Sequence, residues 1–387
     1  MGKLDEAREW ATQHQTQLQR SEHGVGLLAC LDVPMQRRGP RPPYLYNLYR
    51  EALATPDPDA FVAELVRHPQ WWFRRRQLAV VAYDALRRRD ERQALSFLQA
   101  FVGGGYPRLD AGEGSFVNRV EKPAGRKLPS GGGPPVVSVI VAAHNAGETV
   151  SASIRSLLGQ DLSNLEVLVC DDASTDDTLS KIVEASGRDR RVRVFRSVEN
   201  QGPYNVRNSL LPHARGDLIT FHDADDIAFP ERLSTQVDAL RRSGASACIA
   251  KWFRVNSSGN IVFFPDHSCS RRSLVSLMVS RQILEAIPSF RNAFFGGDLE
   301  YFERVLRQFP VVSIRSPLIW GLWESGSLTR QAGSEALETG FRSPLRRAYS
   351  ELLLRLRRCE ISDSRMGEEL ESLGLLRPHA GVVVVSA

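Results

Sequence analysis

Val136-Val-Ser-Val-Ile-Val-Ala142 is a run of apolar, mainly β-branched residues that only Ser138 interrupts. Such a run is typical of a strand buried on both faces of a parallel sheet. Further along the chain, predicted helices at 146–158, 175–185 and 204–213 alternate with predicted strands at 165–170, 192–197 and 217–222. This order predicts an α/β fold with a mostly parallel sheet, helices on both of its faces, and ligands at the carboxyl ends of its strands.

The rest of the chain divides into segments of different composition. Residues 1–102 carry apolar residues at helical spacing and predict a small all-α N-terminal domain. Residues 103–135 are rich in glycine and proline, which predicts a linker. The α/β domain is predicted over 136–330, and a C-terminal tail over 331–387 is predicted to be helical, with a helix at 345–358 and an edge strand near its end.

The overall composition is that of an ordinary globular protein. Of the 387 residues, 42% are hydrophobic and 25% are charged, which argues against general disorder and against a fibrous protein. The 50 basic and 45 acidic residues give a net charge of +5. Arginine clusters at 74–76 and 87–89 fit solvated helix faces or, alternatively, contact with an anionic membrane surface. Because no nucleic-acid-binding motif accompanies them, we expect no nucleic-acid partner.

Cysteine usage and the N-terminus indicate the compartment. The five cysteines are scattered without a C-x-x-C pair, which favours reduced thiols over a disulfide framework or a zinc site. The start, Met1-Gly-Lys-Leu-Asp-Glu6, lacks the apolar core of a signal peptide. No apolar run approaches the roughly 20 residues that a membrane span needs. These features predict a cytoplasmic protein, and peripheral contact with the inner face of the cell membrane stays an open alternative.

Three carboxylates stand within four residues after the predicted strand 217–222, in Asp223-Ala-Asp225-Asp226. In an extended segment the side chains of Asp223 and Asp225 point to the same side, so they can face one site. Their mutual repulsion favours a bound cation, and Mg²⁺ or Mn²⁺ held by one or two carboxylates and substrate phosphates meets that need. The alternative is an acidic turn that caps the next helix.

A second acidic cluster, Asp171-Asp-Ala-Ser-Thr-Asp-Asp177, follows the predicted strand 165–170. A serine or aspartate here can cap the helix that comes next. Capping does not require the pair Asp171 and Asp172 at the very end of a buried strand. A carboxylate in that place can accept hydrogen bonds from a nucleobase N–H or a ribose hydroxyl, so a binding site and a helix cap are both open interpretations.

Four segments, taken in order, resemble the successive sequence blocks of family-two glycosyltransferases. They are VSVIVAAHN at 137–145, VCDDASTDDT at 169–178, ENQGPYNVRN at 199–208 and RGDLITFHDADD at 215–226. The resemblance extends over residues 136–330, about half of the chain. It implies a GT-A (Rossmann-like) fold, a nucleotide-sugar donor, a divalent cation (Mn²⁺ or Mg²⁺) and inversion at the anomeric carbon.

The resemblance also implies roles for the donor-side residues. Asp172 is expected to hold the edge of the base, Asp223 to lie near the ribose, and Asp225 to bind the metal on the diphosphate. Asp226 is expected as a second metal ligand. Arg207 is expected either to contact the nucleotide or to brace the donor loop.

The first strand departs from the family's usual pattern. It ends in Ala142-Ala-His144-Asn145, where the family usually has a hydroxyl residue and then tyrosine. His144 therefore takes the place of the ring that stacks on the base, and the hydroxyl is missing. Further along, Ser327 lies in a Gly-Ser-Leu-Thr segment that resembles a loop over the diphosphate. The predicted nucleotide-sugar-binding set is Ala142, His144, Asn145, Asp172, Arg207, Asp223, Ala224 and Ser327.

The segment FGGDLEYFER at 295–304 resembles the family's acceptor side. Asp298 takes the place of the general base, which must reach the acceptor hydroxyl. The alternative for this aspartate is a cap on the helix that follows. Glu300 is expected to position either the acceptor or the start of that helix. Gly297 replaces the first acid of the usual pair, and Glu324, a second acceptor-side candidate, stands near where many members have a metal-ligating histidine.

These features predict an inverting, metal-dependent glycosyltransferase of hexosyl or N-acetylhexosaminyl type. We expect a nucleoside-diphosphate sugar, preferably a UDP-sugar, as donor and a glycan or lipid-linked hydroxyl as acceptor, in surface polysaccharide biosynthesis. The alternative is a catalytically inactive GT-A-like module that binds a nucleotide sugar or glycan. A nucleotidyltransferase is disfavoured because no glycine-rich basic loop follows the first strand.

Overall fold

The computed structural model describes residues 136–256, 261–262, 270–323, 336–337, 340–341, 344–358, 360–376 and 382–385. The predicted N-terminal helical domain and the linker lie outside the described residues, and so do Glu324 and Ser327. The described chain belongs to two compact units, of which the larger holds the sheet. The predicted domain boundaries themselves stay predictions.

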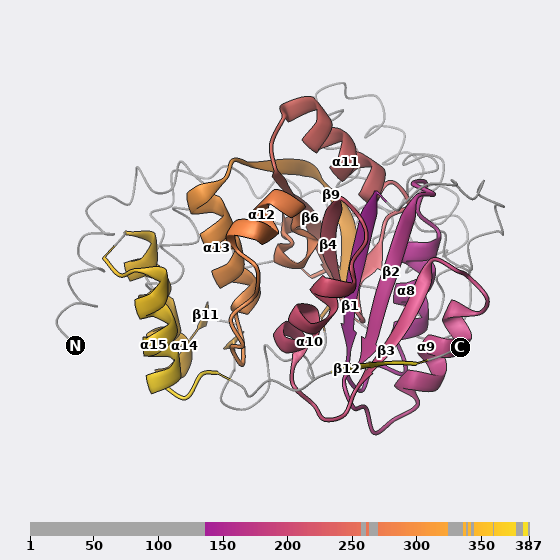
Figure 1. Cartoon of the computed structure of the whole chain (residues 1–387), viewed down its shortest axis with the longest axis horizontal. Coiled ribbons are helices and arrows are strands. Elements are labelled where there is room, and N and C mark those ends of the chain that lie inside the picture. The colour runs from indigo at the N-terminus through magenta and orange to yellow at the C-terminus, as the bar shows by residue number, and fades with distance from the viewer. Residues whose placement is uncertain are drawn as a thin grey trace, which may run out of the picture. The chain divides into compact units, whose positions relative to one another are not determined.

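The first half of the sheet is a parallel α/β arrangement (Figure 1). Its strands lie in the order β3-β2-β1-β4, and all three pairings between them are parallel. The elements in chain order are β1 (Val137–Ala143), α8 (Val150–Leu158), β2 (Leu165–Asp171), α9 (Thr178–Ser186), β3 (Val192–Ser197), α10 (Pro203–Leu210) with a 3₁₀ turn at Leu211–His213, and β4 (Leu218–Asp223). The predicted alternation of strands and helices is confirmed here.

The second half of the sheet is mixed. Beyond β4 the order continues β8-β6-β9-β5, and only the β6–β9 pairing is parallel. A short strand at the C-terminus, β12, pairs antiparallel with β3 and confirms the predicted edge strand. The elements are β5 (Ile227–Ala228), α11 (Arg232–Ser243), β6 (Ala247–Val255), β7 (Ser270–Arg272), a 3₁₀ turn (Leu274–Ser276), β8 (Met278–Ser280), α12 (Arg281–Ala286), α13 (Gly297–Gln308), β9 (Val311–Leu322) and β12 (Val382–Val384).

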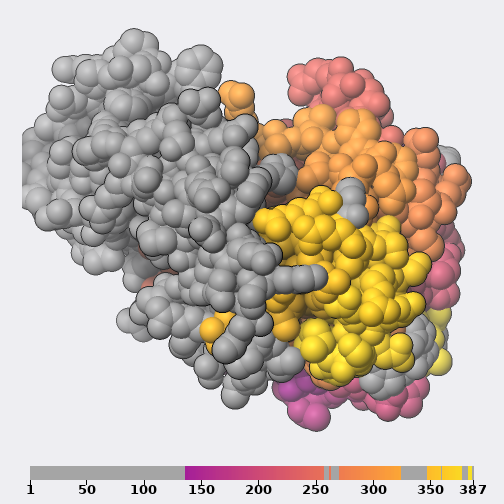
Figure 2. All heavy atoms as spheres, turned by 90° about the vertical axis from the view of Figure 1, so that its left-hand side faces the viewer, coloured from indigo at the N-terminus to yellow at the C-terminus, as the bar shows by residue number. Residues whose placement is uncertain are grey.

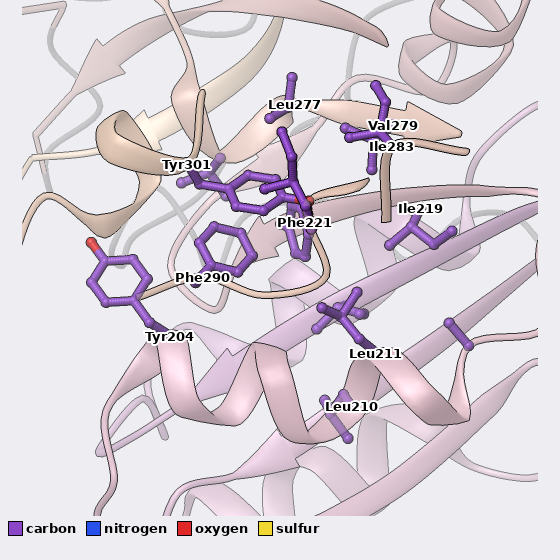
Figure 3. Close-up of a cluster of buried hydrophobic side chains, with 14 of the residues drawn as sticks. Tyr204, Leu210, Leu211, Ile219, Phe221, Leu277, Val279, Ile283, Phe290 and Tyr301 are labelled. Atoms are coloured by element: carbon purple, nitrogen blue, oxygen red, sulfur yellow. Dashed lines mark hydrogen bonds between the residues drawn. The ribbon is translucent and has the colours of Figure 1, made fainter. Parts of the chain in front are cut away.

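Alternate residues of β1 supply two hydrophobic cores on opposite faces of the sheet. Val139 and its neighbours at 137 and 141 pack with α8, α9 and α11. Ile140 faces the other core, which contains side chains from α10, α12 and α13 (Figure 3). Because each fully buried aliphatic side chain contributes about 1.5–3 kcal/mol, a strand buried on both faces is a strong anchor for the domain. The predicted α/β class with helices on both faces is confirmed.

The described part of the smaller unit contains two helices. It comprises β10 (Ala336–Leu337), β11 (Gly340–Phe341), α14 (Pro344–Arg357) and α15 (Asp363–Ser372). The helix predicted at 345–358 is α14. Ser362 caps α15 by accepting the N–H of Arg365 at 3.1 Å, and Arg355 of α14 pairs with Glu369 of α15 at 2.8 Å. Figure 2 shows the two helices as one continuous group of atoms, in yellow.

The described part of the chain contains no candidate membrane-spanning helix. None of its helices combines the length and the apolar character that crossing a bilayer requires.

Candidate active site

The two acidic clusters meet at one edge of the sheet. The register of β1 pairs Ala143 with Asp171 of β2 and Ala142 with Asp223 of β4. Since β1 lies between these strands, the clusters flank the end of β1 on either side. The N–H of Asp172 also bonds the carbonyl of Ala143, at 2.7 Å. The edge is therefore the carboxyl end of a parallel sheet, where ligands bind in such folds.

Asp172 is a buried carboxylate that holds a backbone loop. Its Oδ1 accepts the N–H of Gln201 at 3.1 Å and its Oδ2 accepts the N–H of Gly202 at 2.8 Å. These two bonds fix the loop between β3 and α10. Each carboxylate oxygen can accept a second hydrogen bond, so the bracing leaves acceptor capacity for a ligand.

The end of β1 and the loop after it carry three of the predicted donor-side residues. The exposed ring of His144 bonds the carbonyl of Asp172 through Nδ1 at 2.8 Å. Asn145 has a φ of 48°, a conformation that asparagine tolerates better than most residues. Its N–H bonds Ser174 Oγ and its Oδ1 accepts the N–H of Thr175, both at 2.9 Å. Ala142 is half-buried within β1, one residue before the strand ends.

The DADD segment is a turn, which corrects the extended geometry assumed from the sequence. The N–H of Asp226 bonds the carbonyl of Asp223 at 3.2 Å and closes the turn. The turn still exposes alternate residues, because Asp223 and Asp225 are partly exposed whereas Ala224 and Asp226 are buried. Asp223 and Asp225 therefore both reach solvent at the edge of the sheet.

The carboxylates of this turn repel one another. Burial, followed by the charges of Asp225 and Asp223, raises the pKa of Asp226 well above its usual range. Its Oδ2 is buried without a hydrogen-bond partner. Removal from water also raises the pKa of Asp223, although 36% of this side chain is exposed; Arg207 opposes that rise and the charge of Asp298 adds to it. An added cation at this turn would be attracted by the negative charges of its carboxylates.

Helix α10 connects this turn to the predicted acceptor side. Arg207, which is 3% exposed, donates from Nη2 to Asp223 Oδ1 at 2.8 Å. The next residue, Asn208, bonds the backbone of Phe290 twice, through Nδ2 to its carbonyl and through Oδ1 to its N–H, each at 2.8 Å. Of the two roles predicted for Arg207, the bracing role is the one with contacts in this structure.

Asp298 lies in the first turn of α13. The helix begins at Gly297, so Asp298 is inside the helix and the capping interpretation does not apply. Its side chain is half-buried, and its Oδ1 accepts a hydrogen bond from the hydroxyl of Tyr204 at 3.2 Å. The remaining carboxylate oxygen is the group available for chemistry.

Glu300 has a structural position. Its side chain is fully buried and pairs with Arg291 and with Arg304, the latter at 2.7 Å. These contacts tie α13 to the segment that precedes it. They fit the alternative that Glu300 positions the helix start, and its acceptor-side role stays a prediction.

Sequence reasoning missed Arg254, which lies near the acidic turn. Its guanidinium stacks on the Trp252 ring at 3.4 Å and donates to the carbonyl of Leu322 at 2.8 Å. Burial lowers the pKa of Arg254, while the charges of Asp226, Asp225, Asp223 and Asp298 raise it. Gly321 permits this placement, because a Cβ there would lie 2.7 Å from the Trp252 ring. No local pattern in the sequence distinguishes this arginine from the others.

The described residues do not form a complete metal centre by themselves. No group of three or more His, Cys, Asp or Glu side chains within the described ranges gathers closely enough to hold an ion alone. The carboxylates of Asp225 and Asp226 nevertheless fit Mg²⁺ or Mn²⁺, because these ions bind through one or two carboxylates while phosphates and water supply the other ligands. The unpartnered Asp226 Oδ2 and the repulsion within the turn support that fit.

Comparisons with known proteins show what this chain is similar to. The chain is 36% identical over 123 residues to an Escherichia coli protein, "UDP-Glc:alpha-D-GlcNAc-diphosphoundecaprenol beta-1,3-glucosyltransferase WfgD", a match covering 32% of this chain and 48% of the relative. It is 36% identical over 172 residues to the succinoglycan biosynthesis protein ExoO of Rhizobium meliloti, covering 44% and 48%. The chain thus spans about half the length of these curated relatives.

A solved structure and a family model also match. The crystal structure of S. aureus TarS 1–349 in complex with UDP-GlcNAc aligns with a TM-score of 0.47 and 20% identity, covering 59% of this chain and 69% of that one. The family model "Glycosyl transferase family 2" matches residues 138–306, which include Asp298 and, apart from Val137, all four sequence blocks. Residues 138–306 are therefore a glycosyl transferase family 2 domain.

Proposed function

We propose that the chain is an inverting glycosyltransferase that moves a hexosyl or N-acetylhexosaminyl group from a nucleoside-diphosphate sugar to an acceptor hydroxyl. One observation carries the proposal: a single helix, α10, contacts both predicted halves of the site. Its Arg207 bonds Asp223 of the acidic turn, and its Tyr204 bonds Asp298, the predicted base. The family 2 match over the same residues supports this reading.

The donor is proposed to bind along the edge formed by the ends of β1, β2 and β4. Asp172, His144 and Asn145 would contact the nucleoside, and Asp223 would lie at the ribose. Asp225, with Asp226 as a second ligand, would hold Mg²⁺ or Mn²⁺, which when bound neutralises charge on the departing diphosphate. Ser327 and Glu324 stay predictions from the sequence.

Asp298 is proposed to act as the general base. Its free oxygen takes the proton of the acceptor hydroxyl while the acceptor oxygen attacks the anomeric carbon. The bond from that carbon to the diphosphate breaks on the opposite side, and its electron pair leaves with the diphosphate. Attack from the face opposite the leaving group inverts the anomeric configuration.

The acceptor class is proposed from the relatives. One is named for a glucosyl transfer to an undecaprenyl-diphosphate-linked sugar, and another for succinoglycan biosynthesis. We propose a glycan or lipid-linked acceptor of surface polysaccharide synthesis, preferably with a UDP-sugar as donor. Such an acceptor would place the reaction at the cytoplasmic face of the membrane.

Calorimetric titration with UDP, GDP, CDP and dTDP, each with and without Mn²⁺, tests the donor site. We expect one nucleotide to bind with Mn²⁺, and Asp225→Ala to weaken that binding at least tenfold, because the loss of a carboxylate ligand removes a charge-assisted contact. Asp238→Ala is the matched control, since Asp238 is exposed on α11. Failure of all four nucleotides to bind would contradict the proposed donor site.

A further inference from the structure

Gly297 leaves a space that Tyr204 fills. A Cβ at Gly297 would lie 2.9 Å from Cδ2 of Tyr204, closer than such atoms approach in proteins. Gly297 does not have a positive φ, whereas Gly296 before it has a φ of 71°. The tyrosine ring therefore requires a glycine at 297, and the backbone conformation does not.

Tyr204 is held rigidly and remains a hydrogen-bond donor. Its ring stacks on Phe290 at 5.9 Å, and Phe290 stacks on Tyr301 at 4.2 Å, so Phe290 lies between the two tyrosines (Figure 3). The Arg207 guanidinium lies over the Tyr204 ring at 5.5 Å. Burial, and then the charge of Asp298, raise the pKa of Tyr204, so its hydroxyl keeps its proton at neutral pH.

We propose that Tyr204 is a positioning residue for the general base. Its hydroxyl, 3.2 Å from Asp298 Oδ1, holds one carboxylate oxygen so that the other faces the acceptor hydroxyl. The ring at the same time occupies the space of the acidic side chain that Gly297 lacks. This inference rests on the proposed function, because it assigns the role through Asp298.

The hydroxyl transfers no proton in this role. It donates to the ionised carboxylate before reaction and keeps its own proton throughout. The acceptor proton goes to the opposite oxygen of Asp298.

Tyr204→Phe tests the proposal, with Tyr301→Phe as the matched control. Both are buried tyrosines of one aromatic stack, but the Tyr301 hydroxyl bonds the carbonyl of Ile287 at 3.1 Å and not Asp298. For Tyr204→Phe we expect kcat for sugar release from the nucleotide sugar to fall about tenfold, with KM and nucleotide affinity unchanged. Tyr301→Phe should leave kcat unchanged.

A second variant tests the position of the Tyr204 ring without removing its hydroxyl. Gly297→Ala places a methyl group against the Tyr204 ring, and we expect the same loss of kcat with KM unchanged. A wild-type kcat in Tyr204→Phe would overturn the inference while nucleotide binding by the wild type still supports the donor site. Absence of nucleotide binding and of sugar release in the wild type would instead contradict the proposed function, and the inference with it.

Discussion

Arg207 is buried between one carboxylate and three aromatic rings. Its guanidinium bonds Asp223 and lies between 5.5 and 5.7 Å from the centres of three aromatic rings, those of Tyr204, Phe221 and Phe290. Each such cation–π contact is worth roughly 0.5–2 kcal/mol, more where water is excluded. The arginine therefore belongs to the aromatic core as well as to the acidic edge. A lysine could not make both sets of contacts, because it lacks a planar fork.

The two buried cysteines are expected to be unreactive in the folded protein. Burial is the main cause that raises the pKa of both Cys170 and Cys248 to about 12. In a variant with serine at the other three cysteine positions, a thiol reagent at pH 8 should label neither residue before unfolding and both after it. Rapid labelling of the native protein would contradict the described burial.

The same thiols set a pH dependence of stability. Their pKa values are raised on folding, so above roughly pH 8.5 the unfolded chain releases these protons before the folded one does. The free energy of unfolding should therefore fall as pH rises from about 9 to 12, with a slope near 1.4 kcal/mol per pH unit for each thiol. Replacing both cysteines with alanine should remove that part of the slope.

Helix α11 is anchored to β4 by one buried arginine. Arg232 donates to Gln236 of its own helix and to three groups of β4, namely His222 Nδ1, Thr220 Oγ1 and the carbonyl of Phe221. Burial lowers the pKa of Arg232 to about 10. Burial and the arginine's charge lower the pKa of His222 well below its usual range, so this ring is neutral and bonds the carbonyl of Asp226 through Nε2. Through His222, the network thus holds the backbone of the acidic turn at Asp226.

Arg232→Met should destabilise the domain by about 3 kcal/mol or more, because several buried acceptors lose their donor at once. Chemical denaturation measures the change. Arg241→Met, at an exposed position of the same helix, should cost less than about 0.5 kcal/mol. Similar losses in the two variants would show that the buried network contributes little.

Elements with local signals were predictable from the sequence, and their boundaries less so. The helix predicted from 146 begins at 150, because Asn145 adopts a positive φ and residues 146–149 form a turn. The strand before Asp223 was predicted within one residue, but the turn that follows it was read as extended. Such boundaries depend on hydrogen bonds to other loops, which local periodicity does not record.

Across the whole molecule, the parallel half of the sheet could be predicted and the mixed half could not. The first four strands alternate with helices, and β1, β2 and β3 pair with their sequence neighbours, while β4 pairs with β1 on the other side. In the second half β6 pairs with β9 across more than 50 residues, and β8 inserts between β4 and β6. These pairings depend on contacts distant in sequence, so no local pattern predicts them.

The candidate site shows the same division. Asp172, Asp223, Asp225 and Asp298 were found because they stand in recognisable sequence blocks, although their roles stay proposals. Tyr204, which bonds Asp298, and Arg254, which faces the charges of the acidic turn, were not selected as site residues by sequence reasoning. Packing places these side chains: a glycine at 297 admits Tyr204, and a glycine at 321 admits Trp252 with Arg254.

We infer that Asp298 acts as the general base, while other residues, at the ends of β1, β2 and β4, bind the donor. The most direct test measures nucleoside-diphosphate release from nucleotide sugars by the wild type and by Asp298→Asn, with nucleotide binding measured on both. We predict equal binding and a loss of turnover of about 100-fold or more in the variant, the usual effect of removing a general base. A variant that turns over at the wild-type rate, or a wild type that binds nucleotide but never releases the sugar, would contradict the account, the latter in favour of a binding module.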